Sequence, residues 1–467
     1  MTINLQKALA GLPNPRSESL LPAIRQHHEG TRRKIVVLDD DPTGTQTVYD
    51  TPVLTTWGVD ELLHAMRADG DLFYVLTNSR SLVKQDAVDL ARQIGKNLQQ
   101  AAAASGKDFV LISRSDSTLR GHYPAEVDAV AAATDQPDAI HVIAPFFLQG
   151  GRYTVDDVHY VADGDDLIPA AETPFAQDAA FGFQNSNLID WVMEKWSGTI
   201  ERQQIHSVGL ADLRAADLSP VVKQLRSLAP RSVCVVNAAA MRDMEAFVYA
   251  ALQAESSGQR FIYRTAASFV QAFAGMEPNP LLRSDQMVDA NAKSGLIVVG
   301  SYVPKTTGQL NALLSAEPNL VPVVLDVAEL LADSTDAYAG SLAQQVNEAL
   351  ASDQDVALYS SRQLVKGDDA RSSLSIGNRV SATLVDIVRG VQQRPRFLIA
   401  KGGITSSDVA TKGLDVHRAM VLGQILPGIP VWQLQQESRM PGMPYVVFPG
   451  NVGGESALLD AYRILKR

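Results

Sequence analysis

The chain has 467 residues, which is too long for one ordinary hydrophobic core and predicts two or three domains. Its net charge of −11, with no block rich in lysine or arginine, argues against nucleic acid or an anionic membrane as the main partner. The single cysteine, Cys234, excludes an intrachain disulfide and a cysteine-based metal site, and its apolar surroundings predict a core position. No apolar run approaches the ~18 residues of a membrane helix, and no signal-peptide pattern is present, so we expect a cytoplasmic protein.

From Lys34 onward, short apolar runs alternate with amphipathic stretches, the pattern of a parallel sheet flanked by helices. The strands expected in the first half are Ile35–Leu38, Leu72–Thr77, Phe109–Ser113, Ala139–Ile143, Ile205–Val208 and Val233–Asn237. Those expected in the second half are Gly295–Val299, Leu320–Leu325, Val356–Tyr359, Phe397–Ala400, Val431–Gln433 and Tyr445–Phe448. The stretch Phe273–Ser294 separates the two series. We therefore predict an α/β protein of two domains, 1–275 and 290–467, each a mostly parallel sheet flanked by helices, with the active site in the cleft between them.

The first strand ends on three consecutive acids, Asp39, Asp40 and Asp41, and a Pro42-Thr43-Gly44 turn follows. Ligands of open α/β sheets bind beyond the carboxyl ends of the strands. Adjacent carboxylates repel one another unless cations or hydroxyl donors share the site. A solvated acidic turn that caps a helix is the plainer interpretation. Because the preceding strand reads as fully buried, we favour a site for a polyol or a metal phosphate.

Arginines and hydroxyls follow the next strands. Asn78-Ser79-Arg80 comes after the second strand, and Ser113-Arg114-Ser115-Asp116-Ser117-Thr118-Leu119-Arg120-Gly121 covers the end of the third. Helix capping explains the hydroxyls but not both arginines, which can clamp a carboxylate bidentately. His159 follows two acids, but no matching His/Glu spacing supports a metal, so we interpret it as a hydrogen-bonded surface histidine. Acids and arginines together suit a small hydroxylated acid, such as a sugar acid.

The second half contains small residues at strand-to-helix turns. They are Gly300-Ser301, Lys401-Gly402-Gly403-Ile404-Thr405 and Gly450-Asn451-Val452-Gly453-Gly454. Such turns aim backbone N–H groups at phosphate, although an ordinary tight turn with a helix cap gives the same residues. The P-loop pattern is absent, and no G-x-G-x-x-G stands in the proper context, so a dinucleotide site is disfavoured. We predict a nucleotide lying across these turns.

Together these motifs resemble the four-carbon acid sugar kinase family, long known as a domain of unknown function. The resemblance covers nearly the whole chain from about Lys34. Its carriers are Asp40-Asp41-Pro42-Thr43-Gly44, Asn78-Ser79-Arg80, Asp116-Ser117-Thr118-Leu119-Arg120-Gly121, Gly300-Ser301, Lys401-Gly402-Gly403 and Gly450-Asn451-Val452-Gly453-Gly454. It implies ATP-dependent phosphorylation of the terminal hydroxyl of threonate, erythronate or 3-oxo-tetronate. It also implies that the N-terminal domain binds the acid sugar and the C-terminal domain binds the nucleotide.

The resulting hypothesis assigns a role to each candidate residue. Asp41 is our choice for the catalytic base, with Asp40 as the close alternative and Asp39 also open, and Arg120 would steady the transferring phosphoryl group. The substrate would be held by Asp40, Arg80, Arg114, Ser115, Asp116 and Ser117, with Arg80 and Arg114 on its carboxylate. The nucleotide would be held by Ser301, Gly402, Gly403, Ile404, Thr405, Gly450, Asn451, Gly453 and Gly454.

We expect ATP and Mg²⁺ as cofactors, with the ion held chiefly by phosphates and water rather than by a protein metal site. The expected partners are a sugar acid and ATP, with no nucleic acid and no membrane, and with a homodimer left open. Two rival functions remain. One is a nucleotide-binding sensor without turnover, and the other is a metal-dependent sugar-acid aldolase or dehydratase.

Overall fold

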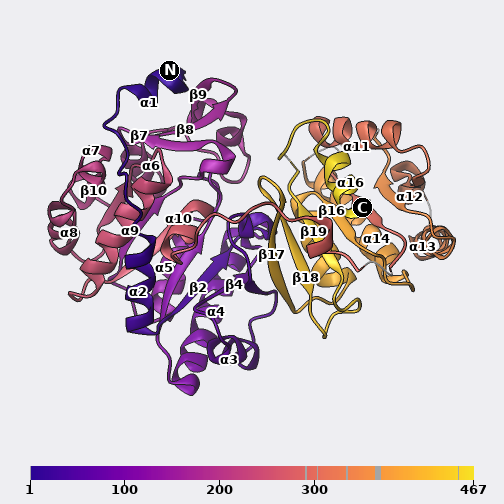
Figure 1. Ribbon diagram of the computed structural model, residues 1–467, viewed down its shortest axis with the longest axis horizontal. Coiled ribbons are helices and arrows are strands. Elements are labelled where there is room, and N and C mark those ends of the chain that lie inside the picture. The colour runs from indigo at the N-terminus through magenta and orange to yellow at the C-terminus, as the bar shows by residue number, and fades with distance from the viewer. Residues whose placement is uncertain (1, 290–291, 302, 333–334, 363–369, 451) are drawn as a thin grey trace. The chain divides into compact units, whose positions relative to one another are not determined.

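The computed structural model describes residues 2–289, 292–301, 303–332, 335–362, 370–450 and 452–467 (Figure 1). The chain divides into two compact units. The first consists of Met1–Val48 and Thr56–Pro278, and the second of Tyr49–Thr55 and Asn279–Arg467. The expected domains, 1–275 and 290–467, did not anticipate that the short segment Tyr49–Thr55 belongs to the second unit. The mixed α/β class with largely parallel strands flanked by helices is confirmed.

A parallel sheet forms the centre of the first unit. Its strands are, in spatial order, β10 (Ile205–Val208), β11 (Val233–Val236), β6 (Ile140–Ala144), β12 (Phe261–Thr265), β5 (Phe109–Arg114), β2 (Lys34–Asp39) and β4 (Leu72–Leu76). Every residue of β2, β4, β5 and β6 is buried, as expected for strands covered on both faces. Cys234 lies in β11 and is buried, which confirms its expected core position.

Helices cover this sheet in two groups (Figure 1). In one, α4 (Lys84–Ser105) packs against α3 (Val59–Arg67) and α5 (Ala125–Ala133). In the other, α9 (Met241–Glu255) packs against α2 (Leu21–Thr31), α7 (Leu210–Arg214), α8 (Ser219–Arg226) and α10 (Ala267–Phe273). Outside these groups lie α1 (Leu5–Ala10) and α6 (Leu188–Lys195).

A small antiparallel sheet of four strands accompanies the parallel one. Its order is β1 (Ile3–Asn4), β9 (Asp166–Pro169), β8 (Val158–Asp163) and β7 (Arg152–Val155). The side chains of β8 alternate between buried and partly exposed positions, which is the usual pattern for a sheet with one covered face. This sheet and β12 were not expected from the sequence.

The second unit contains a mixed sheet. Its order is β3 (Thr51–Leu54), β17 (Arg418–Leu426), β18 (Ile429–Leu434), β19 (Pro444–Phe448), β16 (Leu398–Lys401), β13 (Leu296–Val299), β15 (Val356–Ser360) and β14 (Val321–Leu325). The strands from β19 to β14 are parallel, and those from β3 to β19 are antiparallel. The segment Tyr49–Thr55 belongs here because β3 pairs with β17, and neither strand was expected.

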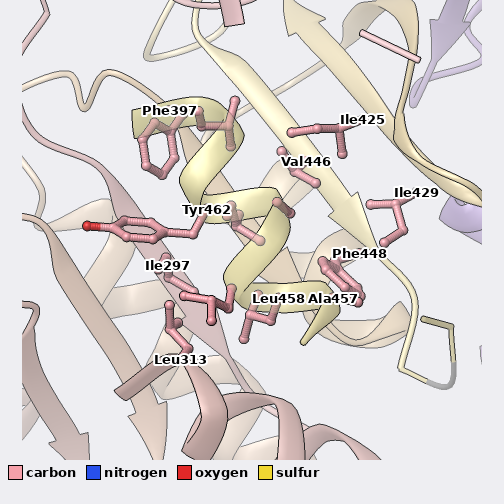
Figure 2. Packing of buried hydrophobic residues seen from close by; sticks show 14 of the residues in the cluster. Ile297, Leu313, Phe397, Ile425, Ile429, Val446, Phe448, Ala457, Leu458 and Tyr462 are labelled. Atoms are coloured by element: carbon pink, nitrogen blue, oxygen red, sulfur yellow. The ribbon is translucent and has the colours of Figure 1, made fainter. Parts of the chain in front are cut away.

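The helices of the second unit are α11 (Pro304–Ala316), α12 (Val327–Ala332), α13 (Thr335–Ala351), α14 (Ala370–Arg389), α15 (Gly403–Asp408) and α16 (Ala457–Lys466). Figure 2 shows Leu458 and Tyr462 of α16 packed with Ile297 of β13 and Leu313 of α11. This core fixes the start of α16 beside the carboxyl end of β19. No helix in the described part of the chain is long and apolar enough to cross a membrane.

Candidate functional site

Polar residues of the first unit gather at the carboxyl ends of neighbouring strands. The strands β6, β12, β5, β2 and β4 lie next to one another in that order. Asp39 is the last residue of β2, and Arg114 is the last residue of β5. The turn Ser79–Ser81 follows β4, and Arg264 lies near the end of β12. Parallel strands end at one edge of their sheet, so the acids and arginines expected from separate motifs meet there.

Asp41 and Asp116 share Arg80. The Arg80 guanidinium forms an ion pair with Asp41 and lies 3.1 Å from Asp116 Oδ1. Asp41 also caps the short 3-10 turn Pro42–Thr45, where its Oδ1 accepts hydrogen bonds from the backbone and the hydroxyl of Thr43. The Asp41 carboxylate is therefore held by protein donors from two sides.

A second arginine joins Asp116 to a loop. Arg120 Nε donates to Asp116 Oδ2 over 2.8 Å, and Arg120 Nη1 lies 3.6 Å from Asp178 Oδ2. The Arg120 guanidinium also lies over the ring of Phe175, 5.0 Å from its centroid. Phe175 and Asp178 bring the loop after the small sheet against the 116–120 turn.

Asp39 is paired with Arg114 beneath these groups. Arg114 Nη1 donates to Asp39 Oδ1 over 3.2 Å, and both side chains are buried. A Cβ on Gly44 would overlap the Asp39 carboxylate, so only glycine fits at this position without moving a buried charge. Asp39 is thus a structural partner of Arg114 and is closed off by the Thr43-Gly44 turn.

Asp40 differs from its neighbours. Both of its carboxylate oxygens are buried, and neither accepts a hydrogen bond from the residues that the structure describes. Its nearest ion-pairing atom is Arg114 Nη1, 3.9 Å from Oδ1. The backbone is fixed on both sides, because Asp40 N donates to Arg114 O and Arg80 N donates to Asp40 O. A rigidly held carboxylate without a donor is costly, so this position suits a group that receives a proton or a hydrogen bond from a ligand.

The pKa values separate the acids in the same way. Burial raises the pKa of Asp39 to about 8, against the opposing effect of Arg114. Burial likewise raises the pKa of Asp40, and Arg80 and Arg114 offset it only in part. For Asp41, burial also acts upward, but Arg80 and the hydrogen bonds from Thr43 hold its pKa below the usual value. The pKa of Asp116 is lowered because Arg80, Arg120 and Thr118 outweigh burial.

Ser115 and Ser117, the remaining predicted residues of this site, lie in the buried turn that supports it. Ser115 and Ser117 are both buried; Ser115 N donates to Thr265 O over 2.8 Å. The Ser117 carbonyl lies 2.8 Å from His159 Nε2. The expected surface position of His159 is wrong: its side chain is fully buried, and burial lowers its pKa to about 4. His159 is therefore a neutral link between β8 and the 115–121 turn.

Arg264 was not among the expected residues. It is fully buried, its Nη2 donates to Arg120 O over 2.8 Å, and it lies over the rings of Tyr123 and Trp191. A Cβ on Gly121 would lie 3.4 Å from Asp40 Oδ2 and 3.7 Å from Arg264 Nη2, so these groups surround one glycine. The signal available in the sequence was an arginine near the end of the short apolar run Phe261–Thr265. The strand β12 was missed because this arginine interrupts the run.

In the second unit, glycine turns meet at the ends of β13, β16 and β19, which are neighbours in the sheet. A Cβ on Gly300 would overlap the Thr405 hydroxyl. Gly402 has φ 119°, and a Cβ there would lie 3.2 Å from both Ser301 Cβ and Thr405 Oγ1. A Cβ on Gly450 would lie 4.0 Å from Ser301 Oγ. These residues therefore form one cradle of closely approaching backbone and small side chains.

Other predicted residues flank this cradle. Gly403 begins α15, and Ile404 is 60% exposed. Gly453 has φ 83°, and Gly454 O accepts a hydrogen bond from Gln309 Nε2 over 2.8 Å. Asn451 lies outside the described residues. All other members of the predicted nucleotide set lie at these three strand ends.

Polar side chains not assigned from the sequence support the cradle. Gln309 Nε2 of α11 contacts the carbonyls of Val452, Gly453 and Gly454. Arg362 Nη1 donates to Ser301 O over 2.7 Å. Lys401 is fully buried, and its Nζ donates to Pro449 O over 2.5 Å and to Gly450 O over 3.3 Å.

Lys401 also lies 4.1 Å from the centroid of the Phe448 ring. Burial lowers the pKa of Lys401 to about 7, and the nearby Lys305 acts in the same direction. The side chain thus holds the turn after β19 through hydrogen bonds from its Nζ, and it forms no ion pair with the residues that the structure describes.

Comparison with known proteins assigns both units. A family model for a sugar-binding N-terminal domain matches residues 35–273, and one for a nucleotide-binding C-terminal domain matches residues 296–458. The chain belongs to this two-domain family. The match confirms the resemblance to the four-carbon acid sugar kinase family that the motifs indicated.

Two curated relatives cover part of the chain. The D-erythronate kinase of Heliobacterium modesticaldum is 26% identical over 298 residues, which are 60% of this chain and 60% of that protein. The D-threonate kinase of Bordetella bronchiseptica is 36% identical over 108 residues, 23% of this chain and 24% of that protein. The chain thus aligns with about 60% of the first relative's length and about a quarter of the second's.

A solved structure supports the fold. A Haemophilus influenzae protein of the same family of unknown function has a TM-score of 0.62 and 17% sequence identity, and the match covers 92% of this chain and 100% of that one. At this identity the likeness concerns the fold alone.

Proposed function

We propose that the protein is an ATP-dependent kinase that phosphorylates the terminal hydroxyl of a four-carbon sugar acid. The observation that carries the proposal is the buried carboxylate of Asp40, which lies within a cluster of arginines but accepts no hydrogen bond from the described residues. Membership of a family with a sugar-binding and a nucleotide-binding domain supports it. Relatives named D-erythronate kinase and D-threonate kinase support the substrate class.

In this proposal Asp40 is the base that orients the attacking hydroxyl. The Asp41 carboxylate, our choice from the sequence, is already engaged by Arg80 and Thr43. Asp40 accepts no hydrogen bond from the described residues, and its raised pKa suits proton acceptance. As the hydroxyl oxygen bonds to the γ-phosphorus of ATP, the bond from that phosphorus to the bridging oxygen of ADP breaks, ADP leaves, and the hydroxyl proton passes to Asp40. Arg80 and Asp116 line the place where the acid lies.

The nucleotide is held in the second unit by the turns at Gly300–Ser301, Gly402–Thr405 and Gly450–Gly454. A Cβ added at Gly300 or Gly402 would crowd Thr405 or Ser301, so the backbone at these turns stays free of side chains. Such turns suit a phosphate chain that contacts backbone N–H groups. Transfer needs little covalent help from the protein, so positioning and charge neutralisation supply most of the rate.

Mg²⁺ is the ion that we expect with the nucleotide, where it would neutralise phosphate charge. No cluster of three or more His, Cys, Asp or Glu residues suited to a metal ion occurs within the described part of the chain. We expect the ion to be held chiefly by the nucleotide phosphates and water.

A coupled ADP-release screen tests the proposal, using D-threonate, D- and L-erythronate and 3-oxo-tetronates. We expect one four-carbon acid to release ADP in step with formation of its 4-phosphate, detected by mass spectrometry. ADP or ATP binding without a phosphorylated product would favour the sensor. Turnover of the acid with a divalent metal but without ATP would favour the aldolase or dehydratase.

A further inference from the structure

The arginines assigned to the substrate carboxylate from the sequence already have partners. Arg80 pairs with Asp41 and Asp116, and Arg114 pairs with Asp39. Arg120 pairs with Asp116 and lies near Asp178. An anionic substrate that uses these arginines must compete with carboxylates of the protein. A cation at the same site without such a partner would bind the substrate's negative end at lower cost.

Arg152 is such a cation. It begins β7, is half-buried, and makes no ion pair with any residue that the structure describes. Its Nη1 donates to Gly150 O, and its Nε is buried without a hydrogen-bond partner. Burial lowers the pKa of Arg152; the Asp116 carboxylate opposes this effect only in part, and Arg120 acts in the same direction as burial. A guanidinium with unused donors in a partly desolvated place is prepared to bind an anion.

The strand β7 is fixed against the acid-and-arginine cluster. Thr154 lies two residues after Arg152, so their side chains share one face of the strand. Thr154 Oγ1 lies 3.0 Å from His159 Nδ1, and His159 Nε2 lies 2.8 Å from the carbonyl of Ser117. The face of β7 that carries Arg152 is therefore linked to the 115–121 turn through a buried, neutral histidine.

Arg152 and Arg120 also share one aromatic ring. The Phe175 centroid lies 5.8 Å from the guanidinium carbon of Arg152 and 5.0 Å from that of Arg120. The ring supports both cations without neutralising them, because its quadrupole attracts positive charge but carries no net charge. Phe175 therefore brings Arg152 and Arg120 near each other, and Arg120 also acts on the pKa of Arg152.

We propose that Arg152, supported by Phe175 and next to Arg120, binds the carboxylate of the sugar acid. This inference rests on the proposed function and adds to it the residue that distinguishes an acid from a neutral polyol. Arg152 fixes one end of the substrate, and Asp40 receives the hydroxyl proton at the other.

The test compares Arg152→Met with wild type on two substrates: the four-carbon acid that wild type phosphorylates best and its neutral primary amide. We expect kcat/KM for the acid to fall by roughly 50-fold or more, the loss typical of a charge-assisted pair. We expect kcat/KM for the amide to change by less than about threefold, and KM for ATP to stay within about twofold, because neither uses the Arg152 charge. Arg152→Lys should recover part of the loss. The control is Arg92→Met, which removes an exposed arginine of α4 that, among the described residues, pairs with Asp89 alone.

Equal losses of kcat/KM for the acid and the amide would overturn the proposal. A fall in kcat with an unchanged KM for the acid would overturn it too, because that result would place the transferring phosphoryl group at Arg152. Calorimetric titration with D-erythronate and D-threonate separates this inference from the kinase proposal. If wild type binds an acid that Arg152→Met does not bind, but forms no phosphorylated product, the anchor stands and the kinase proposal fails. If Arg152→Met binds and phosphorylates the acid as wild type does, the kinase proposal stands and the anchor fails. If wild type binds neither acid, both fail.

Discussion

Replacing Asp40 by asparagine separates the two candidate bases. The amide has the shape of the carboxylate but cannot take a proton at neutral pH, and the backbone at Asp40 stays fixed by Arg114 O and Arg80 N. A positioned general base contributes about 10²–10⁴-fold, so we expect kcat to fall by that factor. This corresponds to about 3–5 kcal/mol of transition-state stabilisation. KM for ATP should stay within about twofold, because the glycine turns that we assign to the nucleotide belong to the other unit.

Asp40→Asn and Asp41→Asn should change the stability of the fold in different directions. The raised pKa of Asp40 means that the folded state disfavours its charge, so Asp40→Asn should leave the Tm unchanged or raise it. The lowered pKa of Asp41 means that its charge stabilises the fold, through Arg80 and Thr43. Asp41→Asn should therefore lower the free energy of unfolding by about 2–3 kcal/mol. Its kcat should fall less than that of Asp40→Asn.

The assay is steady-state ADP release with the best four-carbon acid, with Tm measured on the same samples. The pH profile adds a further check. Activity of wild type should fall as pH decreases through the pKa of Asp40, which lies above that of an ordinary aspartate, and this acid limb should be absent in Asp40→Asn. If Asp40→Asn keeps kcat within tenfold of wild type while Asp41→Asn loses three orders of magnitude, the assignment of the base to Asp40 is wrong.

Two further predictions concern the second unit. Gly402→Ala forces a side chain onto φ 119° and against Ser301, so we expect KM for ATP to rise about tenfold with little change in KM for the acid. The control is Gly340→Ala, where an added Cβ meets nothing within 4 Å, and equal kinetic effects of the two changes would contradict the cradle. The second prediction concerns Lys401, whose pKa is about 7 in the folded protein and higher in the unfolded chain. Between these two pKa values the unfolded chain binds more protons than the folded one. The folded wild type therefore becomes more stable as pH rises through that range. The Tm of wild type relative to Lys401→Met should therefore increase from about pH 7 to about pH 9, by an amount equivalent to roughly 2 kcal/mol, and a flat difference would exclude a buried, titrating lysine.

Much of the parallel framework could be predicted from the sequence. Every expected strand is present, with ends within two residues of the prediction, because buried parallel strands are short apolar runs with polar ends. The strands that were missed lack this signal. Arg264 interrupts β12, and β17 alternates between buried and partly exposed residues around Gly423. The segment that contains β3 joins the second unit through long-range pairing with β17, and no local pattern encodes such a partner.

The sequence predicted which residues gather at this edge of the sheet, but not how they pair. Polar residues at strand ends predict the edge at which a ligand would bind, and Asp40, Asp41, Arg80 and Arg114 all lie at that edge. Which acid meets which arginine depends on strand order, and β5 lies beside β2 although two α-helices and two strands separate them in the chain. Local spacing therefore could not show that Arg80 holds Asp41 and leaves its neighbour without a donor.

These pairings explain how a cluster dense in charge can still recognise a small ligand. Most of its acids and arginines neutralise one another, which makes the cluster rigid and leaves those groups poor competitors for substrate. Within the described residues the exceptions are of opposite kinds: Asp40 accepts no hydrogen bond, whereas Arg152 and the fully buried Arg264 form no ion pair, and of these two arginines only Arg152 is partly exposed. A hydroxy acid carries the complement of both, a hydroxyl donor and a carboxylate. A neutral polyol would leave Arg152 unpaired and a simple carboxylic acid would leave Asp40 without a hydroxyl donor, so the roles that we propose for Asp40 and Arg152 predict selectivity for a sugar acid.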